Sequence, residues 1–398
     1  MRFVTEFDET AKRGYNEKIH FVKKGVFFLG EQVFDLAFVQ KHFHLEGEFL
    51  SSKALNDGHI NTTYQLRFLD KQGQKKDYVV QKINTYVFKD PDALMENIVG
   101  VTSFLRREIE KNGGDPERET LNFLPCDDGK YYVKDQNGDC WRCYHHVGDV
   151  YTCNTIENEE VFKNAGEAFG RFQKMLASYP SDTLKETIPN FHNTYSRFLD
   201  FEKAVRDNLS GRREEAEKEI EFMRAREADT HVLLDLMDKG ELPLRVTHND
   251  TKLNNILFDN KTNRGICVID LDTVMPGLAL YDFGDSIRFG ANTASEDEKD
   301  LSKVSLSLPL YKAYVDGYLG VAKDSLTPRE IEYLPFSSKL MTLECGMRFL
   351  TDFLNGDTYF KTAYPEHNLV RCRTQFKLVE DMEKKMADMQ ALTAEAAK

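Results

Sequence analysis

The spacing of apolar and polar residues changes along this chain, near Gly148. Before it, apolar residues recur at every second position over short runs, which is typical of strands that bury one face. The predicted strands are 59–68, 78–84, 130–135 and 139–147. The last two are joined across Gln136-Asn137-Gly138, and Asn-Gly is a strong signal for a tight hairpin.

A single helix is predicted between these two pairs of strands. It begins at Pro91 and ends near Gly113, and proline and glycine are common at the first turn and just past the last turn of a helix. Its apolar residues repeat at helical spacing, at Leu94, Ile98, Val101, Leu105 and Ile109. The first part of the chain is therefore predicted to be a small sheet with one helix.

After Gly148 the spacing is mostly helical. Helices are predicted over 160–178, 214–239, 329–355 and 368–397. The exception is a central block, where 256–259 and 265–270 indicate two short strands joined by a turn. Because strands and helices are largely segregated, the expected class is α+β. At 398 residues the chain is long enough for two lobes that share a cleft, where a ligand commonly binds.

Composition narrows the choice of partners. The net charge of -13 offers no favourable field to a nucleic acid or an anionic membrane. No apolar run approaches the roughly 18 residues that a membrane-spanning helix needs, so a cytoplasmic location is expected. No obligate protein partner is evident from the sequence. The partners expected are therefore small molecules.

Seven cysteines are spread along the chain, an odd number that favours reduced thiols over a disulfide framework. Cys140 and Cys143 have the spacing of a redox or zinc pair. Their context is a predicted strand, however, where positions three apart face opposite sides of the sheet. The two thiols are therefore predicted to be ordinary core residues.

The main chemical signal is the polar stretch RVTHNDTKLNNILFD, residues 245–259, which leads into the first strand of the central block. Its His248, Asp250 and Asn255 have the spacing of a phosphotransferase catalytic loop. Asp250 would accept the proton of an attacking hydroxyl, and Asn255 would hold the magnesium that bridges the phosphates. As a bare pattern this spacing also fits an ordinary polar turn.

A second aspartate is needed for the metal, after the strand that follows the loop. The literal string DFG begins at Asp282, but the predicted two-stranded ribbon is already complete at Asp270. Asp270 is therefore the predicted metal ligand, with Asp272 as a possible second one. Asp282 and Asp285 are predicted to be structural, as caps or ion pairs that fix the loop and the helix after it.

Three segments, THNDTKLNNILFD, VIDLDTVMPGLALYDFGDSIRFG and ECGMRFLTDFLNGDTYF, together resemble the aminoglycoside phosphotransferase and choline kinase superfamily. Within it they resemble the N-acetylhexosamine 1-kinases, over roughly residues 40–385. The resemblance implies a protein-kinase-like two-lobe fold, with a small antiparallel sheet and one helix in the N-lobe and a mainly helical C-lobe. It also implies ATP and Mg²⁺ as co-substrates. Residues 1–36 would be an N-terminal extension, 37–148 the nucleotide-binding N-lobe, and 149–398 the C-lobe with the catalytic loop and the sugar site.

When the resemblance is applied position by position, it implies that Asp250 is the catalytic base and that Asn255 and Asp270 bind the metal. It places Gly58, His59 and Asn61 in the hairpin over the nucleotide phosphates. The acceptor sugar would meet Asp250, Thr273, Arg348, Tyr359 and Asn368. Arg348 stands in an otherwise apolar helical stretch, where an unpaired guanidinium is costly, so a buried salt bridge is the alternative explanation for it.

One departure concerns the third strand, where most kinases of this type have a lysine that binds the α/β-phosphates. Here Gln81 takes that position among the nucleotide-binding residues, and Lys82 should face the opposite side of the strand. Gln81 is consistent with the hexosamine kinases in this resemblance. The departure puts in doubt a switch that pairs a lysine with Glu96 of the predicted helix.

The function expected is ATP-dependent phosphorylation of the anomeric hydroxyl of N-acetylglucosamine or N-acetylgalactosamine. One rival is a kinase of the same superfamily with another acceptor, such as choline, homoserine or an aminoglycoside. A cationic acceptor would want an acidic or aromatic cage, whereas the carried-over acceptor residues are mostly neutral or basic. The other rival is an inactive nucleotide-binding protein, against which the intact Asp250, Asn255 and Asp270 count.

Overall fold

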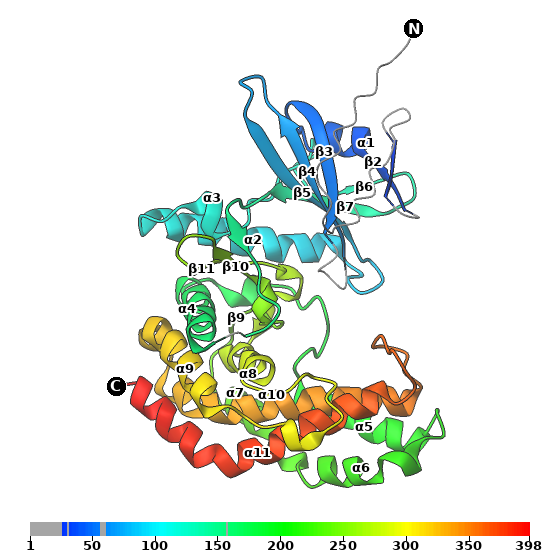
Figure 1. Cartoon of the computed structure of the whole chain (residues 1–398), viewed down its shortest axis with the longest axis vertical. Helices are drawn as coiled ribbons and strands as arrows, with labels where there is room; N and C mark the ends of the chain where they lie inside the picture. The colour runs from blue at the N-terminus through cyan, green and yellow to red at the C-terminus, as the bar shows by residue number, and fades with distance from the viewer. Residues whose placement is uncertain (1–25, 30–31, 56–60, 157) are drawn as a thin grey trace, which may run out of the picture.

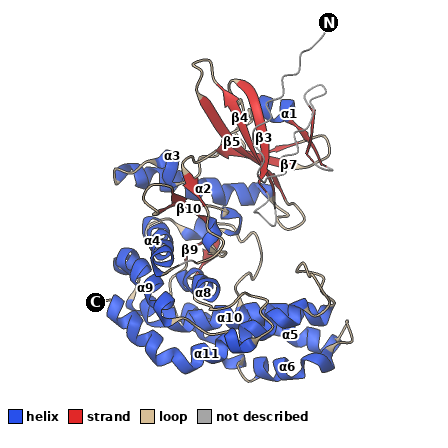
Figure 2. Ribbon diagram, in the orientation of Figure 1, coloured by secondary structure: helices blue, strands red, loops and turns tan. Residues whose placement is uncertain are grey.

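Two lobes make up the computed structural model, which describes residues 26–29, 32–55, 61–156 and 158–398. The strands of the N-lobe lie at one end and the helices of the C-lobe at the other, and α2 (Pro91–Lys111) runs along the boundary (Figures 1 and 2). The predicted segregation of sheet and helices is confirmed. Within the part of the chain that is described, no helix is both long and apolar enough to cross a membrane.

The N-lobe is built on a five-stranded antiparallel sheet in the order β3-β4-β5-β7-β6. Its strands are β3 (Glu48–Leu55), β4 (Thr62–Leu69), β5 (Lys75–Ile83), β6 (Val133–Lys134) and β7 (Cys140–His145). A separate hairpin, β1 (Val26–Leu29) with β2 (Gln32–Asp35), precedes the short helix α1 (Leu36–His42), and α3 (Pro116–Glu119) follows α2. The hairpin predicted at Asn137-Gly138 is confirmed: β6 pairs with β7, and Gly138 has a φ of 84°, which glycine adopts without strain.

The two faces of this sheet bury different cores. One face packs with α1 through residues such as Phe68 and Cys143. The other packs on α2, whose five predicted apolar positions are all buried, and this second core includes Cys140. Cys140 and Cys143 therefore face opposite sides of the sheet, as predicted. Burial raises the pKa of both thiols, which keeps them in the protonated form.

The C-lobe carries most of the helices. They are α4 (Glu159–Met175), α5 (Thr194–Asp207), α6 (Glu217–Arg224), α7 (Val232–Asp238), α8 (Ala279–Gly290), α9 (Leu308–Ala322), α10 (Pro328–Asn355) and α11 (His367–Ala396). Its strands are β8 (Val150–Tyr151), β9 (Arg245–Thr247), β10 (Ile256–Asp259), β11 (Gly265–Val268) and β12 (Met275–Gly277). Short 3₁₀ turns include η3 (Glu227–His231), η4 (Leu253–Asn255) and η5 (Leu271–Thr273). The ribbon predicted from the central block is β10 paired with β11.

One continuous helix over 214–239 was predicted, and that prediction is wrong. The segment breaks into α6, η3 and α7. At the break the buried hydroxyl of Thr230 donates to the backbone oxygen of Glu227 at 2.6 Å, a local bond that competes with the helical pattern. The helix after the DFG string also begins earlier than expected, at Ala279, so Asp282 lies inside α8.

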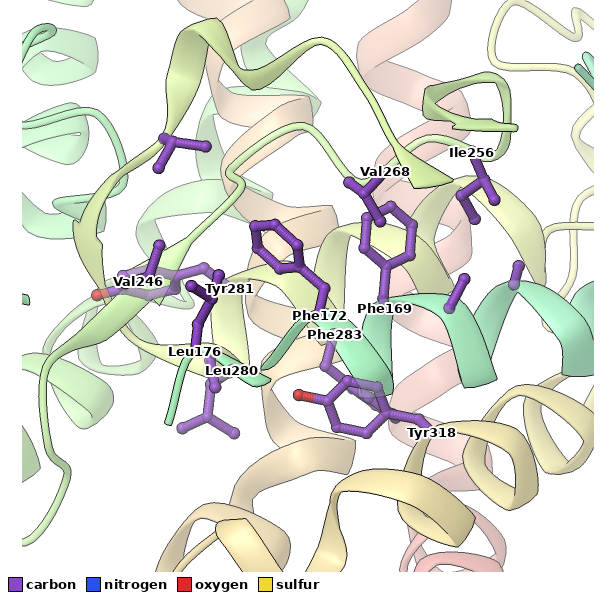
Figure 3. Close-up of a cluster of buried hydrophobic side chains, with 14 of the residues drawn as sticks. Phe169, Phe172, Leu176, Val246, Ile256, Val268, Leu280, Tyr281, Phe283 and Tyr318 are labelled. Atoms are coloured by element: carbon purple, nitrogen blue, oxygen red, sulfur yellow. The ribbon is translucent and has the colours of Figure 1, made fainter. Parts of the chain in front are cut away.

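A core of aromatic and aliphatic side chains supports the catalytic segment from below (Figure 3). Phe169 and Phe172 of α4 lie under Ile256 of β10 and Val268 of β11, and Phe283 of α8 is wholly buried. The backbones of α4 and α9 lie in close contact at Gly166. A Cβ atom at this position would lie only 2.4 Å from the backbone oxygen of Tyr314, so only glycine fits there. This rigid base fixes both ends of the ribbon, where the loop and Asp270 begin.

Candidate active site

The loop that follows β9 holds Asp250 in place through its two preceding residues. The backbone N–H groups of His248 and Asn249 each donate to the carboxylate of Asp282 at 2.8 Å. The His248 ring is buried, lies edge-on to Phe169 and Phe172, and bonds the backbone oxygen of Ile269 at 2.8 Å. His248 therefore pins the loop to the strand that leads to Asp270.

Asp250 is held between two side chains of its own loop. The amide nitrogen of Asn255 donates to the backbone oxygen of Asp250 at 2.8 Å and to its carboxylate at 3.2 Å. The ammonium of Lys252 lies 2.8 Å from the other carboxylate oxygen. Burial disfavours the charge on Lys252, but the adjacent Asp250 carboxylate outweighs it and the pKa of Lys252 is raised. Sequence reasoning missed Lys252, although it is a cation only two positions after Asp250.

Asp270 follows β11 and precedes η5 in a left-handed conformation, with a φ of 59°. Ile269, between β11 and Asp270, donates its backbone N–H to the backbone oxygen of Asn255 at 2.9 Å, so the residues after the strand and the loop lie side by side. Burial, followed by repulsion from Asp272 and Asp250, raises the pKa of Asp270 to about 6. Among the described residues no cation forms an ion pair with Asp270.

These features fit a bound divalent metal. Asp270 is a half-buried carboxylate without a protein counter-ion in the described chain, and Mg²⁺ prefers oxygen ligands of this kind. Asn255 turns its amide nitrogen toward Asp250, which leaves its side-chain oxygen as a second ligand. Asp272, considered above as a further ligand, is instead paired with Arg142 of β7 at 2.5 Å.

Of the four residues predicted to bind the nucleotide, the structure describes two, Asn61 and Gln81. Gly58 and His59 lie outside the described residues. The amide of Asn61 donates to the Asp272 carboxylate at 2.5 Å. Gln81 donates to Thr63 at 3.1 Å and accepts from Arg142 at 2.9 Å.

Lys82 and Glu96 behave as the sequence indicated. The ammonium of Lys82 pairs with Asp139 at 2.6 Å, away from Gln81. Glu96 is exposed on α2, and the described residues include no ion pair with it. In the described part of the N-lobe, no lysine of the sheet is therefore paired with a glutamate of α2.

On the acceptor side, Thr273 belongs to the catalytic loop's own network. Its hydroxyl donates to the backbone oxygen of His248 at 2.6 Å, and its backbone oxygen accepts from the Asn249 amide at 2.8 Å. Arg348 of α10 lies elsewhere, with its guanidinium 5.6 to 5.8 Å from the ring centres of Phe191, Tyr359 and Phe360. The described residues provide no ion pair for Arg348, so the buried salt bridge is not what the structure shows.

Asn368 acts on the same region from within the protein. It is fully buried at the start of α11, and its amide donates to Asp352 at 2.9 Å and to Asp357 at 2.8 Å. The Asp352 carboxylate in turn accepts the backbone N–H groups of Tyr359 and Phe360 at 2.8 and 2.9 Å. Asn368 therefore fixes the turn that carries Tyr359, whose own side chain is 68% exposed.

Two groups of predicted residues thus emerge. Asp250, Asn255 and Thr273 belong to the hydrogen-bonded loop after β9, and Asp270 lies next to it because its neighbour Ile269 bonds both Asn255 and His248. Asn61 and Gln81 bond to the Arg142–Asp272 pair, and Asp272 lies two positions after Asp270. Arg348, Tyr359 and Asn368 form a second group, linked to the first indirectly: the ring of Tyr281, next to Asp282, contacts His192, which bonds Glu344 one helical turn before Arg348.

Solved structures of known proteins share the arrangement of the two lobes. An aminoglycoside phosphotransferase from Alicyclobacillus acidocaldarius is similar in structure, with a TM-score of 0.56 and 12% identity over 90% of this chain and 95% of that one. A spectinomycin phosphotransferase in complex with ADP and spectinomycin has a TM-score of 0.54 and 11% identity, over 89% of this chain and 97% of that one. A microcompartment-associated aminopropanol kinase has a TM-score of 0.51 and 16% identity, over 89% of this chain and 99% of that one.

These likenesses confirm the kinase-like fold. At the level of sequence, residues 136–322 match the model of the phosphotransferase enzyme family (APH). That stretch contains the predicted catalytic loop, with Asp250, and both predicted metal ligands, Asn255 and Asp270.

Proposed function

We propose that the protein is an ATP-dependent kinase that phosphorylates the anomeric hydroxyl of N-acetylglucosamine or N-acetylgalactosamine. The observation that carries the phosphoryl transfer is the placement of Asp250, Asn255 and Asp270 in one hydrogen-bonded loop and ribbon. The ADP held by the spectinomycin phosphotransferase of similar fold supports a nucleotide as donor.

Asp250 is the proposed base. Both of its carboxylate oxygens are oriented, one by Lys252 and one by Asn255, so little reorganisation is needed when a hydroxyl arrives. The anomeric hydroxyl of a sugar is more acidic than an ordinary alcohol, which makes a carboxylate a sufficient acceptor for its proton. Positioning of the hydroxyl in line with the phosphate is the other contribution of the loop.

Asp270 and Asn255 are the proposed metal ligands. A magnesium ion, when bound, supplies charge neutralisation for the transferring phosphoryl group. The protein's own contribution is to keep Asp270 half-buried and without a competing cation among the described residues, while His248 and Asn255 fix the strand before it. A metal stabilises such a carboxylate because partial burial has weakened its solvation.

A neutral sugar suits the acceptor region better than a cationic amino alcohol. Arg348 has no ion-pair partner among the described residues, and Arg197 lies near enough that, after burial, repulsion from Arg348 helps lower the pKa of Arg197. Two neighbouring guanidinium groups would repel choline or an aminoglycoside, whereas both can donate hydrogen bonds to sugar oxygens. This charge pattern, with the resemblance to hexosamine kinases, supports the sugar.

A substrate panel with product identification tests the proposal. Free N-acetylglucosamine or N-acetylgalactosamine should yield a 1-phosphate, seen in phosphorus NMR as coupling to the anomeric proton. The matched control is the methyl glycoside of each sugar, whose 1-oxygen has no proton to give, and it should not react. A 6-phosphate product, equal turnover of the methyl glycoside, or turnover of choline alone would refute the proposed acceptor.

A further inference from the structure

An almost wholly buried ion pair joins the two lobes beside the predicted metal site. Arg142 of β7 lies 2.5 Å from the carboxylate of Asp272 in η5, and the two side chains are 2% and 3% exposed. One partner belongs to the N-lobe sheet and the other to the C-lobe segment that carries Asp270. Because burying a charge is costly unless it is paired, each residue depends on the other.

The N-lobe surrounds the Arg142 guanidinium on its other sides. Its Nε donates to Gln81 of the neighbouring strand at 2.9 Å. Another of its nitrogens lies 3.9 Å from the sulfur of Met95 on α2, and the group lies over the ring of Phe123, 5.7 Å from the centroid. Gln81, at the position where other kinases have lysine, thus orients the arginine.

Asp272 receives a second N-lobe group. Its other carboxylate oxygen accepts from the Asn61 amide at 2.5 Å, and the Asn61 oxygen accepts the backbone N–H of Asn84 at 3.0 Å. Asn61 directly precedes β4, the return strand of the predicted phosphate hairpin. The nucleotide side and the segment that holds Asp270 are therefore connected through one carboxylate.

Protein kinases make a comparable connection differently, with a strand lysine and a helix glutamate that must pair before the site is complete. In this chain Lys82 is paired with Asp139, and Glu96 is exposed. The described N-lobe residues therefore lack that pair. The Arg142–Asp272 contact occupies the boundary between the lobes instead.

We propose that Arg142 and Asp272 are the positioning pair that assembles the nucleotide and metal sites, with Gln81 orienting the arginine and Asn61 coupling the phosphate hairpin to Asp270. The inference rests on the proposed use of ATP and magnesium, and is independent of which acceptor is phosphorylated. A single residue, Leu271, separates Asp272 from Asp270, so a shift of the pair moves the metal ligand relative to the hairpin.

Arg142→Lys and Asp272→Asn test the pair directly, since the first keeps the charge without the planar fork and the second keeps the shape without the charge. We expect the KM for Mg²⁺-ATP to rise about 10- to 100-fold in each, the scale of a misplaced site, while the KM for the acceptor stays within about twofold. Calorimetry with Mg²⁺-ATP in the absence of acceptor should show the same weakening.

The matched control is Arg245→Lys. Arg245 and Glu330 also form a buried pair at 2.5 Å, with side chains 12% and 3% exposed, but both belong to the C-lobe. This variant should lower the melting temperature by an amount similar to Arg142→Lys and leave the KM for ATP unchanged. A loss of ATP binding in both variants would show that general destabilisation, and not the inter-lobe contact, is responsible.

A double variant, Arg142→Met with Asp272→Leu, removes both charges. It distinguishes an effect on the stability of the protein from an effect on the nucleotide site. Replacing a buried ion pair by apolar residues is often neutral for stability, so its melting temperature should recover relative to either single charge removal. Its ATP affinity should stay weak. Wild-type ATP affinity in the double variant or in both single variants overturns the inference. Weakened acceptor-free ATP binding supports it even if no sugar is phosphorylated, in which case only the proposed acceptor fails.

Discussion

Asp282 accepts the backbone N–H of Asn249 at 2.8 Å and so holds that residue in the left-handed conformation, with a φ of 65°. The other carboxylate oxygen accepts from the backbone of His248 and from the Gln173 side chain at 2.8 and 3.1 Å. With all these donors directed at it, Asp282 anchors the turn that presents Asp250. The literal DFG string therefore marks an anchor for the loop, and Asp270 stays the predicted metal ligand.

Asp282→Ala should chiefly destabilise the protein. The change leaves three buried N–H donors without an acceptor, and each unsatisfied donor costs about 1 to 3 kcal/mol. We expect the free energy of unfolding, measured by urea titration, to fall by about 3 kcal/mol or more. Asp282→Asn is the control, because it keeps one carbonyl oxygen and should lose less.

Asp270→Ala should have the opposite profile. It removes the proposed metal ligand without removing a hydrogen bond recorded in the described structure, so the fold should persist while Mg²⁺-dependent nucleotide binding is lost. Calorimetry with ATP, with and without Mg²⁺, measures this. If Asp270→Ala kept metal-dependent binding and Asp282→Ala lost it in a folded protein, the metal would belong to Asp282.

Asp250→Asn tests the base. A positioned general base contributes about 10²- to 10⁴-fold, so turnover should fall by that factor while ATP binding is largely retained. Single-turnover assays with the sugar, together with calorimetry for ATP, separate the two effects. A variant that retained more than about a tenth of wild-type turnover would exclude Asp250 as the base.

Local patterns in the sequence predicted the elements that position the site. The apolar repeat of α2, the Asn-Gly hairpin and the ribbon before Asp270 all depend on neighbouring residues, and all are found. The broken helix over 214–239 and the early start of α8 were not predictable in this way. The first depends on the buried hydroxyl of Thr230, and the second on packing of the helix against the C-lobe core.

The sequence did not predict the ion pair between Arg142 and Asp272 in the candidate site. The guanidinium of Arg142 stands 130 residues before its partner Asp272, and periodicity carries no information about such contacts. A signal was nevertheless present, because an arginine in the middle of the apolar strand CWRC needs a buried counter-ion. That reasoning was applied to Arg348, where the structure shows aromatic rings and no ion pair in the described chain.

The raised pKa of Asp270, about 6, predicts a pH dependence in the metal-free protein. Its folded pKa lies above the unfolded value of about 3.9, so the native state binds the proton more tightly. The penalty from Asp270 is therefore fully present above about pH 6 and fades as the pH falls from 6 toward 4. Without metal, Asp270→Asn should be more stable than wild type at pH 7.5, by a margin that shrinks below pH 6 in urea titrations. A margin independent of pH would contradict the raised pKa.

Arg348→Ala tests the acceptor side. The guanidinium lies among Phe191, Tyr359 and Phe360 without an ion-pair partner in the described residues, so its donors are free for a ligand. Loss of hydrogen bonds from a charged donor costs roughly 1.5 to 3 kcal/mol, or about 10- to 150-fold in affinity. The KM for the sugar should rise by that factor and the KM for ATP should change little. Tyr359→Phe is the companion variant, because it keeps the ring beside Arg348 and removes only the exposed hydroxyl. A rise confined to the KM for ATP would assign Arg348 to the nucleotide, and no change in either constant would remove it from the site.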